Sequence, residues 1–569
     1  MGRDPLPGDG KLTVSVERDL EMRTDDGVVL RADVWRPPGR GPFPVLLLRT
    51  PYDKTLASTI NYAHPGWYAA QGYLVVLQDV RGRWRSDGDF TPFEHEQSDG
   101  HQAIDWAASL PGSNGRVGMY GGSYVGATQL LAARDAPAAL QAIAPGVTGA
   151  QYYDGWTYQQ GALAIGLAST WACELAGDQA RRAGDEAAWR MLMTAAASPG
   201  AWLQYLPLRE HPPLLAGGYA PFYFDWLAHP SYDDYWRRWS IDEDYGSITA
   251  PALNYGGWYD AFARGTVRNF AGLKDSSLLM GPWAHVAWSP RVGAMDYGPL
   301  AAAEIDQAQL RWFDRWLRDD GPADPPRARV FVMGLQDWLE ETAWPPAGVR
   351  EQALFLRSGG RANSVRGDGA LAPDPPGEDD PDRFVYDPLS PIASYGGHSC
   401  CYPESSPIGP ADQAAVESSG RVLVYTGPPV ERRLLVLGPA TLVLHAATDR
   451  ADTDFTARLC DVDADGRSIN LLEGVVRARY RDSLAAPVAV EPGAVYEYRI
   501  DLGPIAHAFL PGHRVRLQVG SSDFPQWDRN LNTGGDFGAE GPLTALLATQ
   551  TVFHTSGRPS RLLLSVAEG

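Results

Sequence analysis

Two short, uninterrupted apolar runs, at residues 45–48 and 73–77, constrain the fold of this chain more than any other feature. Runs of this length without alternating polar residues are typical of strands buried on both faces of a parallel sheet. Residues 99–110 follow with apolar side chains at helical spacing, and a further short strand is predicted at 116–120. Strands that alternate with helices in this way predict a doubly wound α/β sheet.

The β pattern stops at about residue 146 and does not resume before about residue 243. Helices fit best at 162–176 and 184–197, which predicts an α-helical insertion in the α/β core. The segment is rich in Trp and Tyr. These aromatic side chains form either a second hydrophobic core or the lining of a pocket for an apolar ligand, and the sequence leaves both interpretations open.

Strands predicted at 252–255 and 277–280 resume the α/β pattern, and an amphipathic helix at 304–318 is expected to close the sheet. Residues 359–383 are rich in Gly, Pro and Asp, which is typical of a linker or a long loop. Many short strands separated by turns follow between 421 and 566. This pattern predicts a β-sandwich or jelly roll.

The chain is acidic, with 49 Lys and Arg against 69 Asp and Glu and a formal net charge of −20. Such a charge repels phosphate backbones, so we expect no nucleic-acid partner. We find no run of about 20 apolar residues that could cross a membrane. The start, MGRDPLPGDG, lacks the apolar core of a signal peptide. We therefore expect a soluble, cytoplasmic protein without a membrane partner.

Four cysteines, Cys173, Cys400, Cys401 and Cys460, are too few for a disulfide scaffold in so long a chain. No cysteine or histidine cluster has zinc spacing, and neither common nucleotide-binding glycine pattern is present, so we expect neither a metal nor a cofactor. The adjacent Cys400 and Cys401 are interpreted as packed thiols. The alternative is a disulfide bond from one of them to Cys460.

The sequence around Ser123 carries the strongest sign of chemistry. A strand predicted to end at Tyr120 is followed by two glycines and Ser123, and a helix is predicted to begin near Val125. This is the pattern of a nucleophile elbow, a strained turn that exposes the serine hydroxyl. Glycines are needed because a Cβ beside the serine would clash where the turn closes. The common motif has glycine two residues after the serine, whereas this chain has Val125 there and Gly126 one residue later.

A serine hydroxyl becomes a nucleophile only when a base takes its proton and an acid orients that base. In α/β-hydrolase order the acid follows the serine and the histidine comes last, each in a loop after a strand. Asp260 follows the predicted strand 252–255 and a Gly-Gly turn, and His285 follows the predicted strand 277–280. The sequence therefore predicts Ser123, Asp260 and His285 as a catalytic triad.

Acyl transfer also needs hydrogen-bond donors for the developing oxyanion, each contributing about 3–4 kcal/mol. The residue after the nucleophile supplies one backbone N–H, which here is that of Tyr124. A second donor is expected from the loop after the third strand, where the sequence reads RTPY at 49–52. The Tyr52 hydroxyl is the candidate there, and the alternative is a tyrosine that only packs.

Together these patterns predict an α/β protein, with an α/β-hydrolase core, an inserted helical cap and a C-terminal β-sandwich of jelly-roll type. We assign residues 1–145 and 243–355 to the catalytic domain, 146–242 to the cap and 356–569 to the β domain. The β domain is expected to brace the cap and the core.

Five segments in order along the chain resemble the cocaine esterase family of serine hydrolases, which is grouped with X-prolyl dipeptidyl peptidases and α-amino acid ester hydrolases. They are RTPY at 49–52, DVRG at 79–82, GGSYVG at 121–126, GWYD at 257–260 and GPWAH at 281–285. In that family the serine is followed by tyrosine, any residue and then glycine, as it is here. The resemblance extends to nearly the whole chain and implies the same three-part architecture.

Carried over to this chain, the resemblance implies Ser123 as nucleophile, His285 as general base and acid, and Asp260 as the carboxylate that orients the imidazole. It implies an oxyanion hole formed by the Tyr52 hydroxyl and the Tyr124 amide.

The expected substrate contacts follow from the resemblance and from positions in the cap. Phe262 matches a position that lines the acyl pocket in the cocaine esterase family, whereas Trp156 and Trp171 are candidates because of their place in the cap. Members of the group that act on α-amino esters bind the substrate ammonium with a carboxylate cluster. No motif identifies that cluster here, although Asp154 and Glu174 are available.

The first hypothesis is a serine esterase or amidase that forms an acyl-enzyme with a small-molecule substrate carrying a bulky apolar, aromatic acyl group. The second is an X-Pro dipeptidyl peptidase or α-amino acid ester hydrolase that binds a free α-amine. The third is a binding protein on a disabled hydrolase scaffold. A homo-oligomer is compatible with all three.

Overall fold

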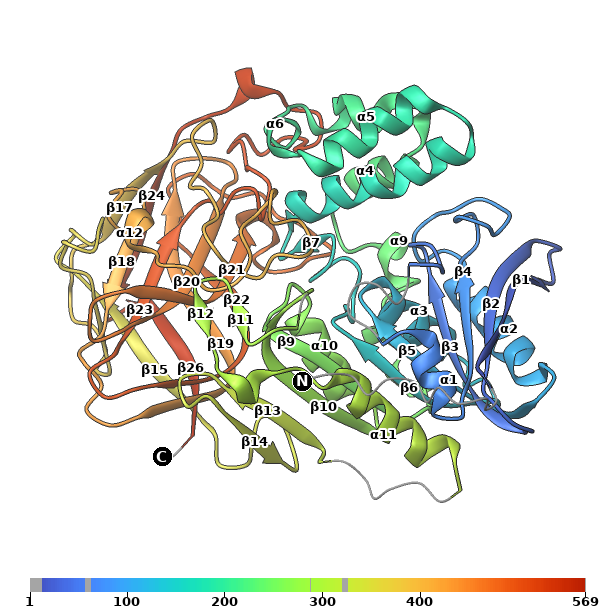
Figure 1. Ribbon diagram of the computed structural model, residues 1–569. Helices are drawn as coiled ribbons and strands as arrows, with labels where there is room; N and C mark the ends of the chain where they lie inside the picture. The colour runs from blue at the N-terminus through green and yellow to red at the C-terminus, as the bar shows by residue number, and fades with distance from the viewer. Residues whose placement is uncertain (1–12, 57–62, 287, 320–325, 568–569) are drawn as a thin grey trace.

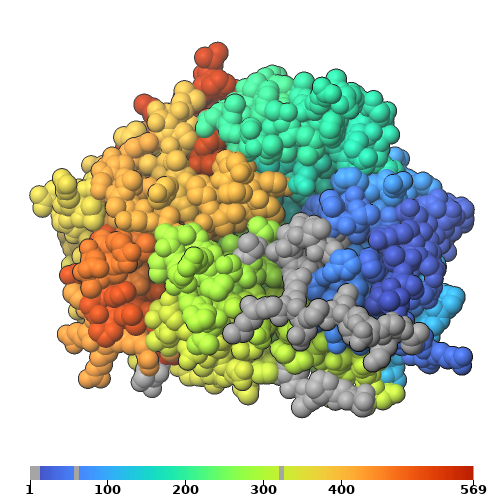
Figure 2. Space-filling view, viewed as in Figure 1, coloured from blue at the N-terminus to red at the C-terminus, as the bar shows by residue number. Residues whose placement is uncertain are grey.

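The computed structural model describes residues 13–56, 63–286, 288–319 and 326–567. An α/β core, a helical cap and a β domain lie side by side, as Figure 1 shows. In the view of Figure 2 the cap, coloured teal, lies at the top of the molecule, next to both the blue part of the core and the orange part of the β domain. The predicted fold class is confirmed. In the part of the chain described, no helix is both long and apolar enough to span a membrane.

The core is one mixed sheet with the strand order β1-β2-β4-β3-β5-β6-β9-β10-β13-β14. Its central strands from β4 to β13 pair in parallel, and antiparallel strands flank them at both edges. The strands are β1 (Ser15–Arg23), β2 (Val29–Arg36), β3 (Phe43–Thr50), β4 (Leu74–Asp79), β5 (Ser113–Gly122), β6 (Leu140–Gly146), β9 (Ala252–Tyr259), β10 (Ser276–Ala284), β13 (Ala328–Val332) and β14 (Asp337–Glu341). Parallel pairing places the carboxyl ends of β5, β9 and β10 at one edge of the sheet.

Helices cover both faces of this sheet. They are α1 (Pro65–Ala70), α2 (Glu96–Ser109), α3 (Tyr124–Ala132), α10 (Ala263–Gly272) and α11 (Ile305–Leu317). Val45 and Leu47 of β3 pack in one apolar cluster with α2 and α3, whereas Leu46 and Leu48 pack in another with α1 and α11. Successive side chains of a strand point to opposite faces, so burial of both faces explains the unbroken apolar run.

The insertion between β6 and β9 is helical, as predicted. It contains a small hairpin, two long helices and several short ones: β7 (Tyr158–Gln159), β8 (Ala162–Leu163), α4 (Ile165–Arg182), α5 (Glu186–Ala197), α6 (Gly200–Leu203), α7 (Pro212–Leu215), α8 (Pro221–Ala228) and α9 (Asp234–Arg237). The buried Arg83 of the core donates to the Leu175 carbonyl of α4 at 2.7 Å. Thr170 of the same helix hydrogen-bonds Ser405 of the β domain at 3.0 Å. Helix α4 is therefore fixed to both other parts.

The β domain is built almost entirely from antiparallel pairs. Its elements are β15 (Arg350–Arg357), β16 (Ala370–Ala372), β17 (Asp382–Tyr386), α12 (Ala414–Glu417), β18 (Leu423–Thr426), β19 (Leu434–Thr448), β20 (Asp454–Val462), β21 (Ser468–Arg477), β22 (Tyr496–Phe509), β23 (Arg514–Gly520), β24 (Ala548–Thr555), β25 (Arg558–Pro559) and β26 (Arg561–Ala567). A further short hairpin, β11 (Arg291–Val292) with β12 (Met295–Asp296), follows β10.

The transition between core and β domain differs from the sequence-based expectation. The expected boundary at 355/356 falls inside β15, whose residues 350–355 pair with β26. Residues 359–383, expected to be a linker or loop, contain β16 and fold back through the buried Asp382, whose carboxylate accepts from Ser358 and Tyr425. Their Gly, Pro and Asp content serves turns within the domain, not a connection between domains.

A buried ion pair lies beneath the elbow that carries Ser123. Arg49, which is fully buried, contacts the Glu96 carboxylate at 2.7 Å and the Gln78 amide oxygen at 3.0 Å. Glu96 also accepts from the Tyr124 hydroxyl at 2.9 Å. Burial raises the pKa of Glu96, so its charge depends on the guanidinium beside it.

Arg49→Met is expected to destabilise the protein by about 3–5 kcal/mol, because it leaves the Glu96 carboxylate buried without its cation. The measurement is the midpoint of urea unfolding followed by circular dichroism. The control is Arg40→Met, since Arg40 is exposed and should shift stability by less than about 0.5 kcal/mol. Equal midpoints for the two variants would contradict the prediction.

Candidate active site

Ser123 stands in the sharp turn between β5 and α3. Its backbone has φ 63° and ψ −131°, a combination that a residue with a Cβ rarely adopts. Its N–H donates to the Gly146 carbonyl at 2.9 Å, and its own carbonyl accepts from Gly126 and Ala127 in the first turn of the helix. The strand, the strained serine and the helix form the nucleophile elbow that the sequence predicts.

Two glycines allow this turn to close. Gly121 has φ +125°, and a Cβ there would lie 2.3 Å from Cγ1 of Val125. A Cβ on Gly126 would lie 2.8 Å from Cβ of Thr148 and 2.9 Å from the Gly146 carbonyl oxygen. Glycine is therefore needed at position 126, three residues after the serine, because this is where α3 approaches the end of β6.

Asp260 and His285 meet behind the serine, each directly after its strand. Asp260 follows β9 and His285 follows β10, and Oδ1 of the aspartate lies 2.7 Å from Nδ1 of the imidazole. Both are buried, with relative exposures of 1% and 3%. The carboxylate thus fixes the ring and directs Nε2 away from itself.

The Ser123 side chain and the His285 ring line one cavity of about 480 Å³. Among the hydrogen bonds of the described residues, none joins the serine hydroxyl to the imidazole. In a hydrolase without substrate this contact is often long and shortens when substrate binds. The structure therefore brings all three predicted triad residues to one site, with the aspartate–histidine bond already formed.

The two candidate oxyanion donors lie near the serine. The Tyr52 hydroxyl borders the cavity and accepts a hydrogen bond from Nε1 of Trp171 at 3.1 Å. The hydroxyl is the acceptor in this bond, since an indole N–H can only donate. Tyr124 is the first residue of α3, where backbone N–H groups lack a partner within the helix. Its phenol is buried and held by Glu96 and Phe93.

The three candidate substrate contacts lie together. Trp156, Trp171 and Phe262 all border the cavity. The rings of Trp156 and Phe262 are 4.3 Å apart, and Phe262 is 5.2 Å from the His285 ring. The aromatic side chains of the cap therefore agree with both interpretations of the sequence. Many of them pack in a hydrophobic core, and these two tryptophans also border the cavity.

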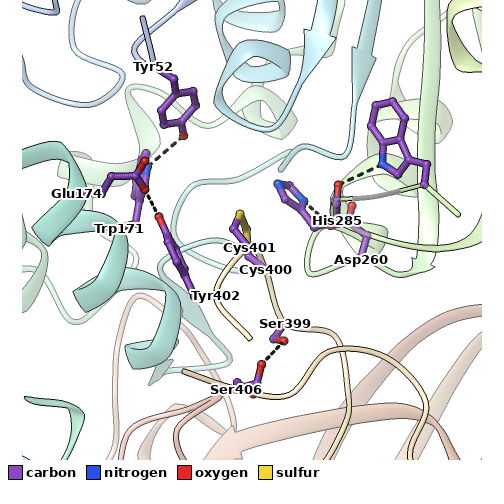
Figure 3. The surroundings of a disulfide bond; sticks show 11 residues. Tyr52, Trp171, Glu174, Asp260, His285, Ser399, Cys400, Cys401, Tyr402 and Ser406 are labelled. Atoms are coloured by element: carbon purple, nitrogen blue, oxygen red, sulfur yellow. Dashed lines mark hydrogen bonds and ion pairs between the residues drawn. A yellow bond between two sulfur atoms is a disulfide. The ribbon is translucent and has the colours of Figure 1, made fainter. Parts of the chain in front are cut away.

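The β domain contributes to the cavity, which the sequence did not indicate. Cys400, Cys401 and Tyr402 border it together with Ser123 and His285. Figure 3 shows them between the His285–Asp260 pair and a group formed by Tyr52, Trp171 and Glu174. The β domain therefore does more than brace the other two parts.

The expectations for the cysteines are wrong. Cys400 and Cys401 form a disulfide bond with each other, whereas Cys173 and Cys460 are free and buried. The adjacent pair is thus neither two packed thiols nor a partner of Cys460. The adjacency of the two cysteines is visible in the sequence, but no residue pattern near them points to the active site.

Glu174 is the one carboxylate that borders the cavity within the described residues. It accepts a hydrogen bond from the Tyr402 hydroxyl. Burial, followed by the charge of Glu174, raises the pKa of Tyr402 well above its usual value. Asp154, the other candidate for amine binding, lies elsewhere and contacts the Gln160 amide and Arg268.

Comparison with known proteins agrees with this arrangement. A family model described as X-Pro dipeptidyl-peptidase (S15 family) matches residues 26–287, which include all three triad positions. A second, described as the X-Pro dipeptidyl-peptidase C-terminal non-catalytic domain, matches residues 321–563. Cocaine esterase of Rhodococcus sp. (strain MB1 Bresler) is 35% identical over 98% of this chain and 99% of the relative.

Two solved structures share the complete architecture. An aminopeptidase from a marine sediment archaeon, Thaumarchaeota archaeon, is 25% identical with a TM-score of 0.81, and the match covers 100% of this chain and 98% of that one. An α-amino acid ester hydrolase has the same TM-score at 24% identity, with 99% and 98% covered. At 24% identity, the similarity to the α-amino acid ester hydrolase shows a common fold only.

Proposed function

The chain belongs to the cocaine esterase-like family of serine hydrolases, which is related to the S15 X-Pro dipeptidyl-peptidases, and from this premise we propose that it is an esterase for substrates with a bulky apolar acyl group. As a member of this family it is a serine hydrolase that acts on esters or peptides. One observation supports the proposed preference for a bulky apolar acyl group: the cavity bordered by Ser123 and His285 is lined mainly by aromatic and aliphatic side chains.

The proposed reaction begins when Nε2 of His285 takes the proton of the Ser123 hydroxyl as the oxygen attacks the ester carbonyl. The Asp260 carboxylate stabilises the imidazolium that forms. The Tyr52 hydroxyl and the Tyr124 N–H donate to the negative oxygen of the tetrahedral intermediate. His285 then protonates the leaving alcohol, and water releases the acid from the acyl-enzyme by the same steps.

The acyl group is proposed to lie against Trp156, Trp171 and Phe262. Full burial of an aromatic ring contributes about 1.5–3 kcal/mol. The esterase should therefore hydrolyse p-nitrophenyl benzoate or phenylacetate with a kcat/KM about 10- to 100-fold above that for p-nitrophenyl acetate, after correction for intrinsic reactivity. A preference for acetate would contradict the proposed acyl pocket.

Tyr52→Phe is expected to lower kcat by about 10²- to 10³-fold, because it removes one oxyanion donor and keeps the ring. KM should change little, since the hydroxyl acts mainly on the transition state. Tyr395→Phe is the matched control, because Tyr395 is half exposed in the β domain. Unchanged kcat in Tyr52→Phe would show that this tyrosine only packs.

A second candidate function follows from Glu174, whose carboxylate borders the same cavity. A carboxylate at this place is suited to bind the α-ammonium of an amino ester or a peptide N-terminus. The test compares an α-amino ester with its N-acetylated form, in the wild type and in Glu174→Gln. A preference for the free amine that Glu174→Gln removes would favour the exopeptidase or amino-ester hydrolase.

A further inference from the structure

The Cys400–Cys401 disulfide lies in the wall of the active-site cavity. It belongs to the loop between β17 and α12 and borders the cavity together with Ser123 and His285. Cys400 is buried, whereas Cys401 is partly accessible. A reductant that enters the cavity can therefore reach the pair, and any change in the two sulfurs takes place beside the triad.

The loop that carries the pair is held in place. Within this loop, two backbone hydrogen bonds between Gly397 and Gly409, at 2.7 and 2.8 Å, close the segment that contains both cysteines. The Ser399 hydroxyl donates to the Ser406 carbonyl at 3.0 Å, as Figure 3 shows. These bonds do not involve either sulfur, so the loop can keep its position when the disulfide opens.

A third donor stands next to the two sulfurs. A ring nitrogen of His285 and the Sγ atoms of Cys400 and Cys401 lie within 4.8 Å of one another. Nδ1 is engaged by Asp260, so the nitrogen available to a ligand on the cavity side is Nε2. A histidine held by a carboxylate through its other nitrogen is the usual form of a metal-binding imidazole.

In the described part of the chain, no other group of three or more His, Cys, Asp or Glu side chains has ligand atoms this close together. Two thiolates and one neutral imidazole form a donor set that Zn²⁺ binds tetrahedrally, with the fourth position open to water. The disulfide form does not offer this set, because only thiolates are strong ligands. The redox state of the pair therefore decides whether the site exists.

We propose that the Cys400–Cys401 pair, once reduced, forms with His285 a binding site for a thiophilic divalent cation such as Zn²⁺, and that its occupation inhibits the hydrolase. A dithiol reductant supplies two electrons and two protons, so that the S–S bond is replaced by two S–H groups and the reductant becomes its own disulfide. Zn²⁺ then binds both sulfurs, and the two thiol protons leave to solvent.

Inhibition rests on the proposed function, in which Nε2 of His285 must accept the proton of Ser123. A nitrogen lone pair that binds a metal ion cannot also accept that proton. The oxidised enzyme keeps this nitrogen for catalysis, so it should not respond to zinc at this site. The other two cysteines are unsuitable ligands: both are buried, and burial raises the pKa of the Cys173 thiol to about 12.

The first experiment measures reduction of the disulfide and metal binding in the absence of substrate. One sample of the protein is left untreated, and another is treated with a dithiol reductant that is then removed under argon. The thiols of both samples are counted after the chain is unfolded. The oxidised chain should show two reactive thiols of its four cysteines, and the reduced chain four. Reduced protein is then titrated with Co²⁺, followed by the thiolate-to-cobalt absorption band, and with Zn²⁺ by calorimetry. We expect one ion per reduced chain.

The variants separate the pair from the rest of the protein. Cys400→Ser/Cys401→Ser should lose the cobalt band, and His285→Ala should weaken zinc binding while the band persists. Cys460→Ser keeps the pair and should bind like the wild type. Oxidised wild type is the control that needs no substitution, should a variant fail to fold.

The activity experiment compares the hydrolysis rate of each protein in the presence of Zn²⁺ with the rate of the same protein without metal. At a Zn²⁺ concentration of about ten times the dissociation constant, the reduced wild type should lose about tenfold in rate, and a chelator should restore it. The oxidised wild type and the double serine variant should keep their rates.

The outcomes are distinguishable. Equal zinc affinity in the oxidised, reduced and double-serine proteins would overturn the site, as would a pair that no dithiol reduces in the folded protein. Zinc that binds the reduced chain without slowing an active enzyme would overturn the inhibition. A chain that shows the cobalt band and hydrolyses no ester or peptide would overturn the proposed function while supporting the site.

Discussion

Ser123→Ala is expected to lower kcat/KM for a p-nitrophenyl ester of an aromatic acid by about 10⁶-fold. Without the hydroxyl no acyl-enzyme forms, and the oxyanion donors with the binding cavity leave about 10³- to 10⁴-fold catalysis over water. The substitution removes one oxygen from a partly accessible side chain, so the fold should persist. The measurement is single-turnover hydrolysis at high enzyme concentration.

Ser109→Ala is the matched control, because this serine is exposed at the end of α2. It should hydrolyse the ester at the wild-type rate. A fluorophosphonate probe adds a second readout, since only an activated serine reacts with it. The probe should label the wild type and Ser109→Ala but not Ser123→Ala. A wild type that neither reacts with the probe nor hydrolyses ester would favour a binding protein on a disabled scaffold.

Asp260→Asn is expected to lower kcat/KM by about 10³- to 10⁴-fold with little change in KM. Oδ1 of the aspartate lies 2.7 Å from Nδ1 of His285 in a buried setting, and this carboxylate can only accept a hydrogen bond. It therefore holds the imidazole proton on Nδ1 and leaves Nε2 to accept the serine proton. An asparagine NH₂ in the same place donates to Nδ1 and stabilises the opposite tautomer.

The control for this substitution is Asp225→Asn, at an exposed position in α8. Its rate should stay within about twofold of the wild type, as is usual for surface substitutions. The rate of fluorophosphonate labelling should fall in Asp260→Asn together with the ester rate, because both reactions need the same activated hydroxyl. Asp260→Asn protein with wild-type kcat would exclude this residue as the orienting acid.

All three parts of the chain contribute to the candidate active site. The core supplies the proposed triad, and helix α4 of the cap supplies Trp171 and Glu174. A loop of the β domain closes the cavity with the cysteine pair and Tyr402, which is hydrogen-bonded to Glu174. A change in the β domain can therefore act directly on catalysis.

Much of the site was predictable because its signals are local. Ser123, Asp260 and His285 each follow a short apolar strand, and parallel pairing brings the carboxyl ends of neighbouring strands together. Gly126 departs from the common elbow motif, and only the resemblance to the family predicts a glycine there. Its close contact with Thr148 became visible only in the structure.

The boundary of the β domain was harder to predict from the sequence. Turn-forming residues at 359–383 suggested a linker or a long loop, and the preceding strand β15 already pairs with β26 at the far end of the sequence. Pairing between segments some 200 residues apart leaves no periodicity in either of them. Composition therefore indicated a sandwich without indicating where it begins.

The sequence alone determined the alternation of strands and helices, the elbow at Ser123 and the order of the proposed triad residues, since each depends on side chains within one or two elements. Tertiary structure alone decided that Cys400 and Cys401 bond to each other and stand beside His285. That contact depends on how the β domain packs against the α/β core, with which it shares a buried apolar cluster. Such packing is fixed by the burial of whole surfaces and not by any residue pattern near the cysteines.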